Sequence, residues 1–558
     1  MLKRFSMVLP PEVQERLDEE LDRMREDRVI ERIWDKDPDV WTRGEESGWL
    51  GWLDIAKREI EDLSKYEGFS ETAGEFDGIV LLGMGGSSLC PDVLSKVFGV
   101  DRFHVLDSTV PDQVAHLTSS VEPSTTLFIV ASKSGTTLEP NIFLDHFFEL
   151  VSKEKGGTAG ENFVAITDPG SKLQARAEEE GFRKVLFGDP EIGGRFSALS
   201  VFGIAPASAM GLDIKALLNS AVEMTDECEL DEPATNSGAV LGAALGTCWL
   251  ERRDKLEILA SKSVESMGAW LEQLIAESTG KEGKAIIPVD LRGKVPGNTG
   301  RKDRVTVYLR DSENPDQGHE SYIEELKAAR EPVITIKFND KADIGAEFFR
   351  WEFATAVAGH LMFINPFNQP DVESAKVEAR KLTDSYEETG ELPADKAFFE
   401  GDGMSFHSSS ENRVAIGEPG SAGGIINAHF ERIAPGDYAA ILAYIEMNDA
   451  NSEVLERIRE KIISRYGVST SVQFGPRFLH STGQAFKGGP GTGVFLQISG
   501  ADENKVDVPG KSYTFSVVKD AQARGDFQVL LDRERRALRV EFEGDVTKGL
   551  KQIESMIE

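Results

Sequence analysis

The sequence predicts an α/β protein with two doubly wound parallel-sheet domains and a C-terminal α/β region. Short apolar runs, as long as buried strands, alternate with stretches whose apolar residues recur at helical spacing. The runs that predict strands lie at 79–82, 103–106, 126–131, 163–166, 184–187, 256–259, 304–309 and 332–337. Strands that alternate with helices in this way form parallel sheets covered by helices on both faces.

We expect four parts along the chain. Residues 1–70 form a helical N-terminal segment, because apolar residues recur at helical spacing between 13 and 33. Residues 71–250 and 251–385 form the two doubly wound domains, and residues 398–558 form a C-terminal α/β domain. The charged stretch 382–397 is the expected linker.

Composition excludes several classes of protein. Among 558 residues, 96 are acidic and 62 basic, giving a formal charge of −34 that opposes nucleic acid and anionic membranes. The three cysteines (Cys90, Cys228, Cys248) are widely spaced, which favours a reducing compartment over a disulfide framework or zinc site. The start of the sequence lacks a full apolar signal core, and no apolar run approaches 18 uninterrupted residues. We therefore expect a cytoplasmic protein.

The most informative segment is Ser-Lys-Ser-Gly-Thr-Thr-Leu-Glu at 132–139. It lies between a predicted buried strand and a predicted helix, so the N–H groups of the first helical turn and the helix dipole favour an anion there. Four hydroxyls and one lysine accompany them. The segment predicts a phosphate cradle; the alternative is an ordinary Ser/Thr helix cap.

A glycine-rich loop, Gly-Met-Gly-Gly-Ser at 83–87, follows the first predicted strand. It is not a dinucleotide fingerprint, because Ser88 stands where the third glycine is required. A Walker loop fails as well, since Glu282 follows Gly280 and Lys281. The loop is either a tight turn that a sugar can approach closely, with Ser87 directed into a site, or a plain turn.

Three further segments carry residues suited to proton transfer. Arg195 follows two glycines, and a guanidinium is well shaped to stabilise an oxyanion, although most arginines form surface ion pairs. Glu277 closes a strongly apolar helix, where a carboxylate can act as a general base. Gln369 begins a predicted helix, and Lys376 lies two turns further along the same face.

In this order, the five segments resemble the phosphoglucose isomerase family. The family pattern is Gly-x-Gly-Gly-Ser, Ser-Lys-x-x-Thr-Thr-x-Glu, Gly-Gly-Arg-[Phe/Tyr]-Ser, Glu-Ser-x-Gly-Lys, and Asn-x-Phe-x-Gln with a lysine seven residues later, and it covers about 77–380 here. The resemblance implies two sugar-isomerase (SIS) domains, no metal or nucleotide, and a homodimer.

The resemblance also implies a role for each matched residue. The substrate, chiefly its phosphate, binds at Gly86, Ser87, Ser132, Lys133, Ser134 and Thr137. Glu277 is the base that moves a proton between carbons 2 and 1, and Arg195 stabilises the enediolate. Gln369 and Lys376 line the site, and Lys376 assists ring opening.

The family's ring-opening histidine has no clear equivalent in this chain. Between Glu277 and Lys376 only His319 and His360 occur; His360 lies in an apolar helix, so His319 is the expected catalytic histidine, despite its acidic flanks. Further on, a glycine-rich stretch holds His480 and Lys487, which either reach the sugar or form a solvated turn.

The layout beyond residue 398 is similar to the isomerase half of transaldolase–isomerase fusion proteins. Because only residues 1–76 precede the first α/β unit, we expect isomerase activity without transaldolase activity.

We therefore expect a metal-independent enzyme that interconverts glucose 6-phosphate and fructose 6-phosphate. One alternative is an isomerase of mannose 6-phosphate, or of both epimers, since the same base and cradle serve either substrate. The other is a non-catalytic sugar-phosphate-binding regulator. A regulator would not need Glu277, Arg195, Gln369 and Lys376 together, and all four are present.

Overall fold

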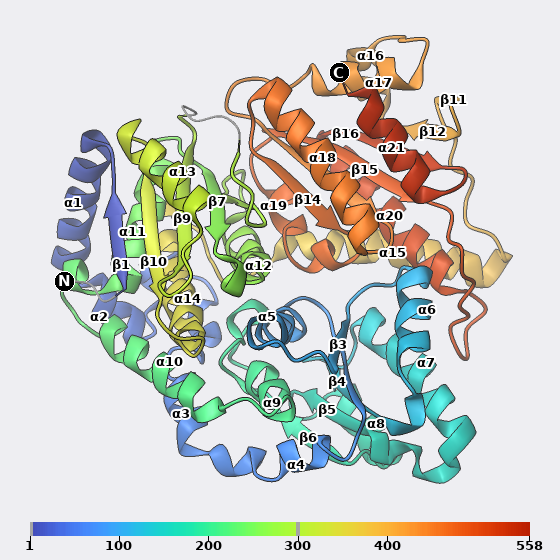
Figure 1. Ribbon diagram of the computed structural model, residues 1–558, viewed down its shortest axis with the longest axis horizontal. Helices are drawn as coiled ribbons and strands as arrows, with labels where there is room; N and C mark the ends of the chain where they lie inside the picture. The colour runs from blue at the N-terminus through green and yellow to red at the C-terminus, as the bar shows by residue number, and fades with distance from the viewer. Residues whose placement is uncertain (1–3, 297–301, 558) are drawn as a thin grey trace.

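The strands of the protein form three sheets within residues 4–296 and 302–557, the part that the computed structural model describes. Figure 1 shows them as three lobes: the first sheet below in blue to teal, the second at upper left in green to yellow, and the third at upper right in orange to red. The mixed α/β class with parallel sheets is as predicted.

The first sheet is wholly parallel, in the order β3-β2-β4-β5-β6. Its strands are β2 (Gly78–Leu82), β3 (Phe103–Leu106), β4 (Thr126–Ala131), β5 (Phe163–Thr167) and β6 (Lys184–Phe187). The helices of this lobe are α5 (Leu89–Phe98), α6 (Pro111–Ser120), α7 (Leu138–Lys155), α8 (Lys172–Glu179) and α9 (Val201–Ala209). Strand order reverses between β2 and β4, and ligands of doubly wound sheets bind at the carboxyl ends of strands at such a point.

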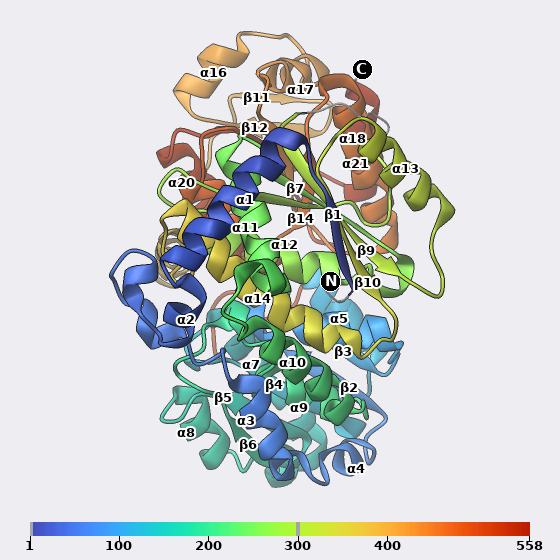
Figure 2. The same cartoon turned by 90° about the vertical axis from the view of Figure 1, so that its left-hand side faces the viewer.

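The second sheet has the order β1-β10-β9-β7-β8 and is parallel except for β1. Its strands are β1 (Phe5–Val8), β7 (Lys255–Ala260), β8 (Ile287–Asp290), β9 (Arg304–Asp311) and β10 (Val333–Phe338). The helices of this lobe are α10 (Ile214–Cys228), α11 (Ser237–Leu250), α12 (Met267–Thr279), α13 (Gln317–Ala328) and α14 (Asp343–Met362). The N-terminal segment adds β1 to the edge of this sheet and lays α1 (Pro11–Glu26) beside it (Figure 2). The short helices α2 (Val29–Trp34), α3 (Ile55–Glu61) and α4 (Phe69–Ala73) follow.

The third sheet has the order β11-β12-β16-β15-β13-β14. Its strands are β11 (Phe399–Gly401), β12 (Met404–His407), β13 (Tyr438–Tyr444), β14 (Thr470–Phe474), β15 (Gly493–Gly500) and β16 (Arg536–Phe542). The helices are α16 (Ser410–Ile416), α17 (Ala422–Phe430), α18 (Asp449–Tyr466), α19 (Gly483–Gly488), α20 (Phe515–Asp532) and α21 (Val546–Met556). Helix α15 (Pro370–Thr389) leads from the second sheet to the third, so half of the expected linker at 382–397 is helical.

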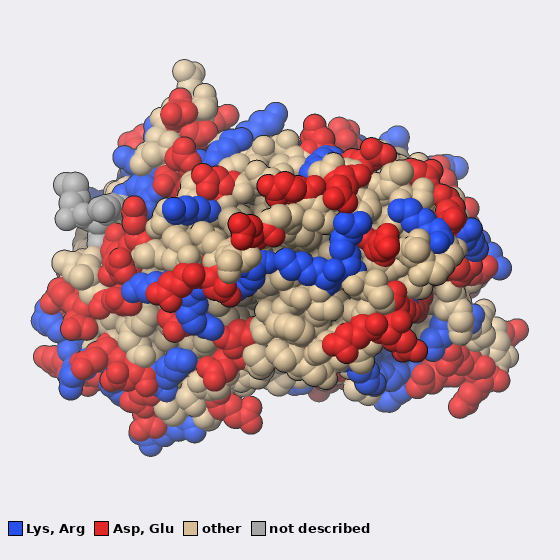
Figure 3. All heavy atoms as spheres, turned by 90° about the horizontal axis from the view of Figure 1, so that it is seen from below, with Lys and Arg blue, Asp and Glu red and all other residues tan. Residues whose placement is uncertain are grey.

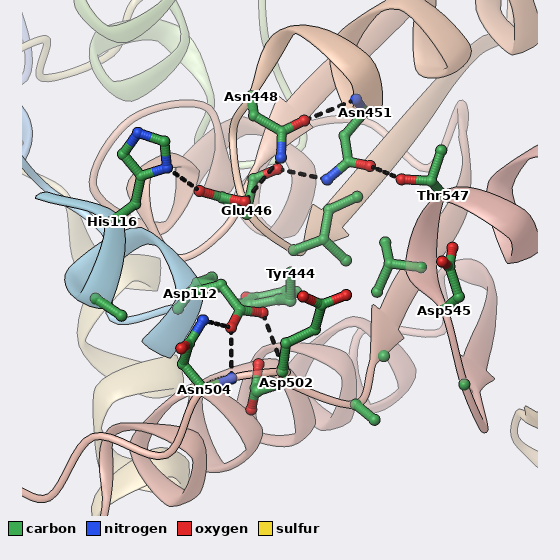
Figure 4. A pocket seen from close by; sticks show the side chains of 18 of the residues that line it. Asp112, His116, Tyr444, Glu446, Asn448, Asn451, Asp502, Asn504, Asp545 and Thr547 are labelled. Atoms are coloured by element: carbon green, nitrogen blue, oxygen red, sulfur yellow. Dashed lines mark hydrogen bonds and ion pairs between the residues drawn. The ribbon is translucent and has the colours of Figure 1, made fainter. Parts of the chain in front are cut away.

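The C-terminal lobe meets the first lobe across a polar boundary, which Figure 4 shows around a cavity of about 640 Å³. Asp112 of α6 accepts hydrogen bonds from the backbone N–H groups of Glu503 (3.2 Å) and Asn504 (2.8 Å). His116 of the same helix lies 3.4 Å from the carboxylate of Glu446. The polar groups around this cavity therefore hold the two lobes together.

Apolar contacts join the C-terminal lobe to both other lobes. Phe143 of α7 stacks on Phe515 of α20, with ring centroids 6.1 Å apart. Tyr308 of the second sheet belongs to one buried cluster with Tyr438 of the third sheet and Phe486 of α19. The C-terminal lobe is therefore part of one packed body, not an appended module.

Candidate functional site

The predicted phosphate loop lies at the strand-order reversal of the first sheet. It runs from the end of β4 to the start of α7, where Thr137 is the N-cap residue. Gly135 has φ +65°, and a Cβ there would meet the backbone N of Leu173 at 2.4 Å, so the tight loop requires glycine. Ser132 is 4% exposed, and its hydroxyl has no hydrogen-bond partner among the described residues. This hydroxyl is therefore available to bond a ligand or a water molecule in the cleft.

The other groups of this loop face the same cleft. Ser134 Oγ lies 2.7 Å from Thr136 Oγ1, and Lys133 pairs with Asp168 at 2.9 Å. Lys133 also donates to the carbonyl oxygen of Asp189 at 2.9 Å, so these two contacts fix its ammonium at the wall of the cleft.

The glycine-rich loop after β2 packs directly on the segment that precedes Arg195. A Cβ on Gly86 would stand 2.0 Å from the carbonyl oxygen of Gly194, so the two backbones touch. Ser87 lines the cleft. This loop thus acts as support for the arginine as well as a wall of the site.

Arg195 is buried and bonded on several sides. Its Nε donates to Ser278 Oγ at 2.7 Å, and Nη1 donates to Gln369 Oε1 at 2.6 Å. Its Nη2 donates to the carbonyl oxygens of Pro366 (2.6 Å) and Asn368 (2.9 Å). Burial lowers the pKa of the guanidinium, and the nearby carboxylate of Glu277 opposes this. The arginine thus joins the segment 365–369 to the helix that carries the predicted base.

Lys281 also binds the segment 365–369. The residue is 1% exposed, and its ammonium donates to the carbonyl oxygen of Asn365 at 2.7 Å and to that of Asn368. Burial and the charge of Arg195 lower the pKa of this lysine well below its ordinary value. Two buried basic side chains, Arg195 and Lys281, therefore hold the segment that presents Gln369.

Glu277 lies at the end of α12, 6% exposed, with its carboxylate 3.7 Å from Arg195 Nη1. Gln273, one helical turn earlier, donates from Nε2 to Glu277 Oε2 at 3.2 Å and to the carbonyl oxygen of His480 at 2.7 Å. The carboxylate is thus oriented by one amide and faces one guanidinium.

His480 reaches the cleft from the C-terminal lobe. Its Nε2 lies 3.0 Å from Oε1 of Glu139, the last residue of the phosphate-loop motif. Glu139 also accepts a hydrogen bond from Gln522 Nε2 at 2.7 Å. Burial alone would raise the pKa of Glu139, but the charge and hydrogen bond of His480 lower it below its ordinary value. The carboxylate of Glu139 therefore fixes the orientation of the His480 ring at the edge of the cleft.

Two neighbouring cavities form the site. The first, about 450 Å³, is lined by the phosphate loop, Gly86, Ser87, Arg195, Gln273, Glu277, Gln369 and His480. The second, about 420 Å³, lies beyond the phosphate loop and is lined by Lys376 among others. Lys376 pairs with Glu373 at 2.7 Å. Both cavities are bordered by Ser134, Thr137, Glu373 and His480, which places Lys376 next to the cleft that holds Arg195 and Glu277.

The structure does not bring His319 to this cleft, so the sequence-based expectation for this residue needs correction. His319 is 5% exposed in the first turn of α13, where Nε2 lies 2.8 Å from the carbonyl oxygen of Gly293 and the ring packs edge-on against Tyr308. His360 is held by the carbonyl oxygen of Val40. Lys487 forms a buried ion pair with Asp526 at 2.6 Å. Of the three histidines considered, only His480 lines the cleft.

The sequence analysis missed Gln273, Glu139 and Gln522 as members of the site. For Gln273 a signal exists, because a residue four positions before Glu277 shares its helix face. Glu139 lies within the phosphate-loop motif, but it has no evident role until its histidine partner is known. Gln522 carries no local signal.

Comparison with known proteins agrees with this arrangement. The family model described as phosphoglucose isomerase matches residues 52–288. A glucose-6-phosphate isomerase from Thermus thermophilus is 30% identical over 396 residues, which cover 61% of this chain and 91% of that protein. The chain belongs to the phosphoglucose isomerase family. A glucose-6-phosphate isomerase from Cyanothece sp. (strain PCC 7425) is 30% identical over 394 residues, which cover 59% of this chain and 73% of that protein.

Solved structures show the same fold. A hypothetical protein from Thermus thermophilus superposes with a TM-score of 0.57 and 26% identity, covering 67% of this chain and 99% of that one. A glucose-6-phosphate isomerase from Chlamydia trachomatis superposes with a TM-score of 0.51 and 20% identity, covering 66% and 79%. The stretch matched by the family model holds the phosphate loop, Arg195 and Glu277, and it ends before Gln369 and His480.

Proposed function

We propose that this chain is a glucose-6-phosphate isomerase that interconverts glucose 6-phosphate and fructose 6-phosphate through an enediolate. The observation that supports it most directly is one buried carboxylate, Glu277, 3.7 Å from one buried guanidinium, Arg195, beside a phosphate loop. Aldose–ketose exchange needs one base on one face of a planar intermediate and a fixed positive charge near its oxygen. The names of the curated relatives agree with this reaction.

Binding begins at the phosphate loop in this proposal. The helix N-terminus at Thr137, the free hydroxyl of Ser132 and the charge of Lys133 attract the phosphate. On the face seen in Figure 3, acidic side chains are spread among basic ones, and only a short row of basic side chains crosses the centre. With a formal charge of −34, the chain depends on such a local site to hold an anionic substrate.

His480 is our candidate for the ring-opening group. Glu139 holds one ring nitrogen at 3.0 Å, so the other nitrogen is the one that exchanges a proton with the sugar. Lys376, next to the same carboxylate, assists in the adjoining cavity. Glu277 then removes a proton from carbon 2 and returns it to carbon 1, and a hydroxyl proton passes from oxygen 2 to oxygen 1. Arg195 stabilises the enediolate oxygen in between.

The same groups also fit an isomerase that accepts mannose 6-phosphate, either alone or in addition to glucose 6-phosphate. Assays with both epimers distinguish these specificities. Isomerase activity without transaldolase activity is a separate proposal, and a transaldolase assay on the same preparation tests it. A sugar phosphate is the proposed partner molecule. Among the described residues, no helix is both long and apolar enough to cross a bilayer.

The first experiment compares the wild type with Glu277→Gln in a coupled assay of fructose 6-phosphate conversion, with EDTA present. The amide retains the shape but cannot accept the proton, so turnover is expected to fall by at least about 100-fold while substrate binding remains close to normal. Equal turnover in both would show that the base is another residue. A wild type without activity that still binds sugar phosphates would favour the regulator.

A further inference from the structure

The C-terminal lobe also touches the catalytic machinery through one buried glutamine, Gln484 of α19. This side chain is fully buried. Its Oε1 accepts a hydrogen bond from the backbone N–H of Asp371 at 2.9 Å. Its Nε2 donates to Asp371 Oδ2 at 2.8 Å and to the carbonyl oxygen of Gly280 at 2.8 Å. Both amide hydrogens and the amide oxygen are therefore used.

The two partners of Gln484 belong to the two helices that carry the proposed chemistry. Gly280 is the C-cap residue of α12, three positions after Glu277. Asp371 lies in the first turn of α15, two positions after Gln369 and five before Lys376. One amide thus joins the end of the helix with the base to the start of the helix with the substrate-lining residues.

The packing around this amide leaves it little freedom. A Cβ on Gly280 would stand 2.2 Å from Cα of Ala485, so α19 lies directly against the end of α12. Arg533, at the end of α20, forms an ion pair with the other oxygen of Asp371. Primary amides are the side chains that offer two donors and an acceptor in one plane, so no apolar residue can reproduce these bonds.

We propose that Gln484 is a positioning residue through which the C-terminal lobe sets the separation of α12 and α15, and with it the distance of Glu277 from Gln369 and Lys376. The proposal rests on the function proposed above. The phosphate loop belongs to the first lobe, and the hydrogen bonds of Gln484 run to α12 and α15 instead. Loss of the amide therefore moves the reacting groups and leaves the phosphate anchor in place.

The test compares Gln484→Met with Gln497→Met in the full chain. Gln497 is also a fully buried glutamine of the C-terminal lobe, but its bonds, to Ala523 and Asp526, stay within that lobe. Both changes remove a buried amide, so both lower the melting temperature. We expect kcat to fall about 10- to 100-fold in Gln484→Met only, the scale of a small misplacement of reacting groups. Binding of inorganic phosphate, which depends on the phosphate loop of the first lobe, is expected to change less than about twofold in both variants.

A second measurement separates failure of this proposal from failure of the proposed function. Amide hydrogen exchange at 277–284 and 370–376 is expected to accelerate in Gln484→Met and to stay unchanged in Gln497→Met. If the wild type is inactive, exchange alone still decides whether Gln484 holds the two helices. If Gln484→Met retains the kcat and the exchange rates of Gln497→Met, the proposal is overturned.

Discussion

At the residue scale, the bonding of Arg195 defines how it can act. A guanidinium has five N–H groups. Four are directed to Ser278, Gln369, Pro366 and Asn368. The remaining one belongs to Nη1, the atom 3.7 Å from Glu277. An arginine held in this way cannot swing toward the substrate, so it offers one fixed donor beside the base, and a preorganised donor of this kind contributes about 3 to 4 kcal/mol to transition-state stabilisation.

His480→Gln tests the ring-opening role at the same scale. We expect turnover of fructose 6-phosphate to fall about 100-fold, because no acid–base group then faces the ring oxygen of the sugar. A four-carbon aldose 4-phosphate cannot close a stable sugar ring, because the hydroxyl that would close it is phosphorylated. His480→Gln is therefore expected to retain most of the wild-type turnover of that substrate. The measurement is kcat with both substrates.

Two controls accompany it. Glu277→Gln is expected to lose both activities, and His116→Gln, at an exposed histidine 72% open to solvent, is expected to lose neither. An equal loss with both substrates in His480→Gln would assign the histidine to proton transfer at carbon instead of ring opening.

At the scale of elements, the contact between two glycine loops gives a further prediction. Gly86→Ala would place a methyl group 2.0 Å from the carbonyl oxygen of Gly194, which must then move together with Arg195. We expect a loss of about 1 to 3 kcal/mol in the free energy of unfolding, on the scale of overpacking, and a fall in kcat. Urea unfolding and the coupled assay measure the two effects.

Gly157→Ala is the matched control, because a Cβ there meets no atom of the described residues within 4 Å. If Gly86→Ala keeps wild-type activity, the glycine loop does not support Arg195.

The elements also show why sequence predicts some features and not others. Parallel strands that are buried on both faces consist of continuous apolar residues in the sequence. The predictions for β2, β3 and β4 therefore agree with the structure almost to the residue. Strand β1 has only four residues, and Phe5 is the one that is buried, so it leaves no such run. Helix α15 presents a narrow buried stripe, including Val372, Ala375 and Ala379, among many charges, which explains why the sequence indicates a linker over its second half.

The same reasoning applies to the site. Phosphate loop, base and arginine each sit in a local motif whose residues lie close in sequence. His480 meets Glu139 across 341 positions, and only the packing of the C-terminal lobe on the first lobe brings them together. No periodicity or spacing carries that information.

At the scale of the whole molecule, a buried acidic pair lies where the C-terminal lobe meets the second sheet. Glu272 of α12 accepts a hydrogen bond from the backbone N–H of Asp290 at 3.1 Å and from Gln473 of β14 at 2.9 Å. Burial, together with the charge of Asp290, raises the pKa of Glu272, and burial likewise raises the pKa of Asp290. The folded protein therefore retains protons here that the unfolded chain has released.

A state that holds more protons loses stability as pH rises. The protons retained by the folded protein stabilise it at pH values near the ordinary carboxylate pKa of about 4. This stabilisation is lost as the pH rises toward the raised pKa values of Glu272 and Asp290. Glu272→Gln keeps the size and shape of the side chain without the ionisation, so its melting temperature is expected to fall less between pH 5 and pH 8 than that of the wild type. The exposed Glu12→Gln is expected to follow the wild type. Parallel melting curves for Glu272→Gln and the wild type across this range would mean that the pair does not titrate between the folded and unfolded states, and that the boundary between the lobes is insensitive to pH.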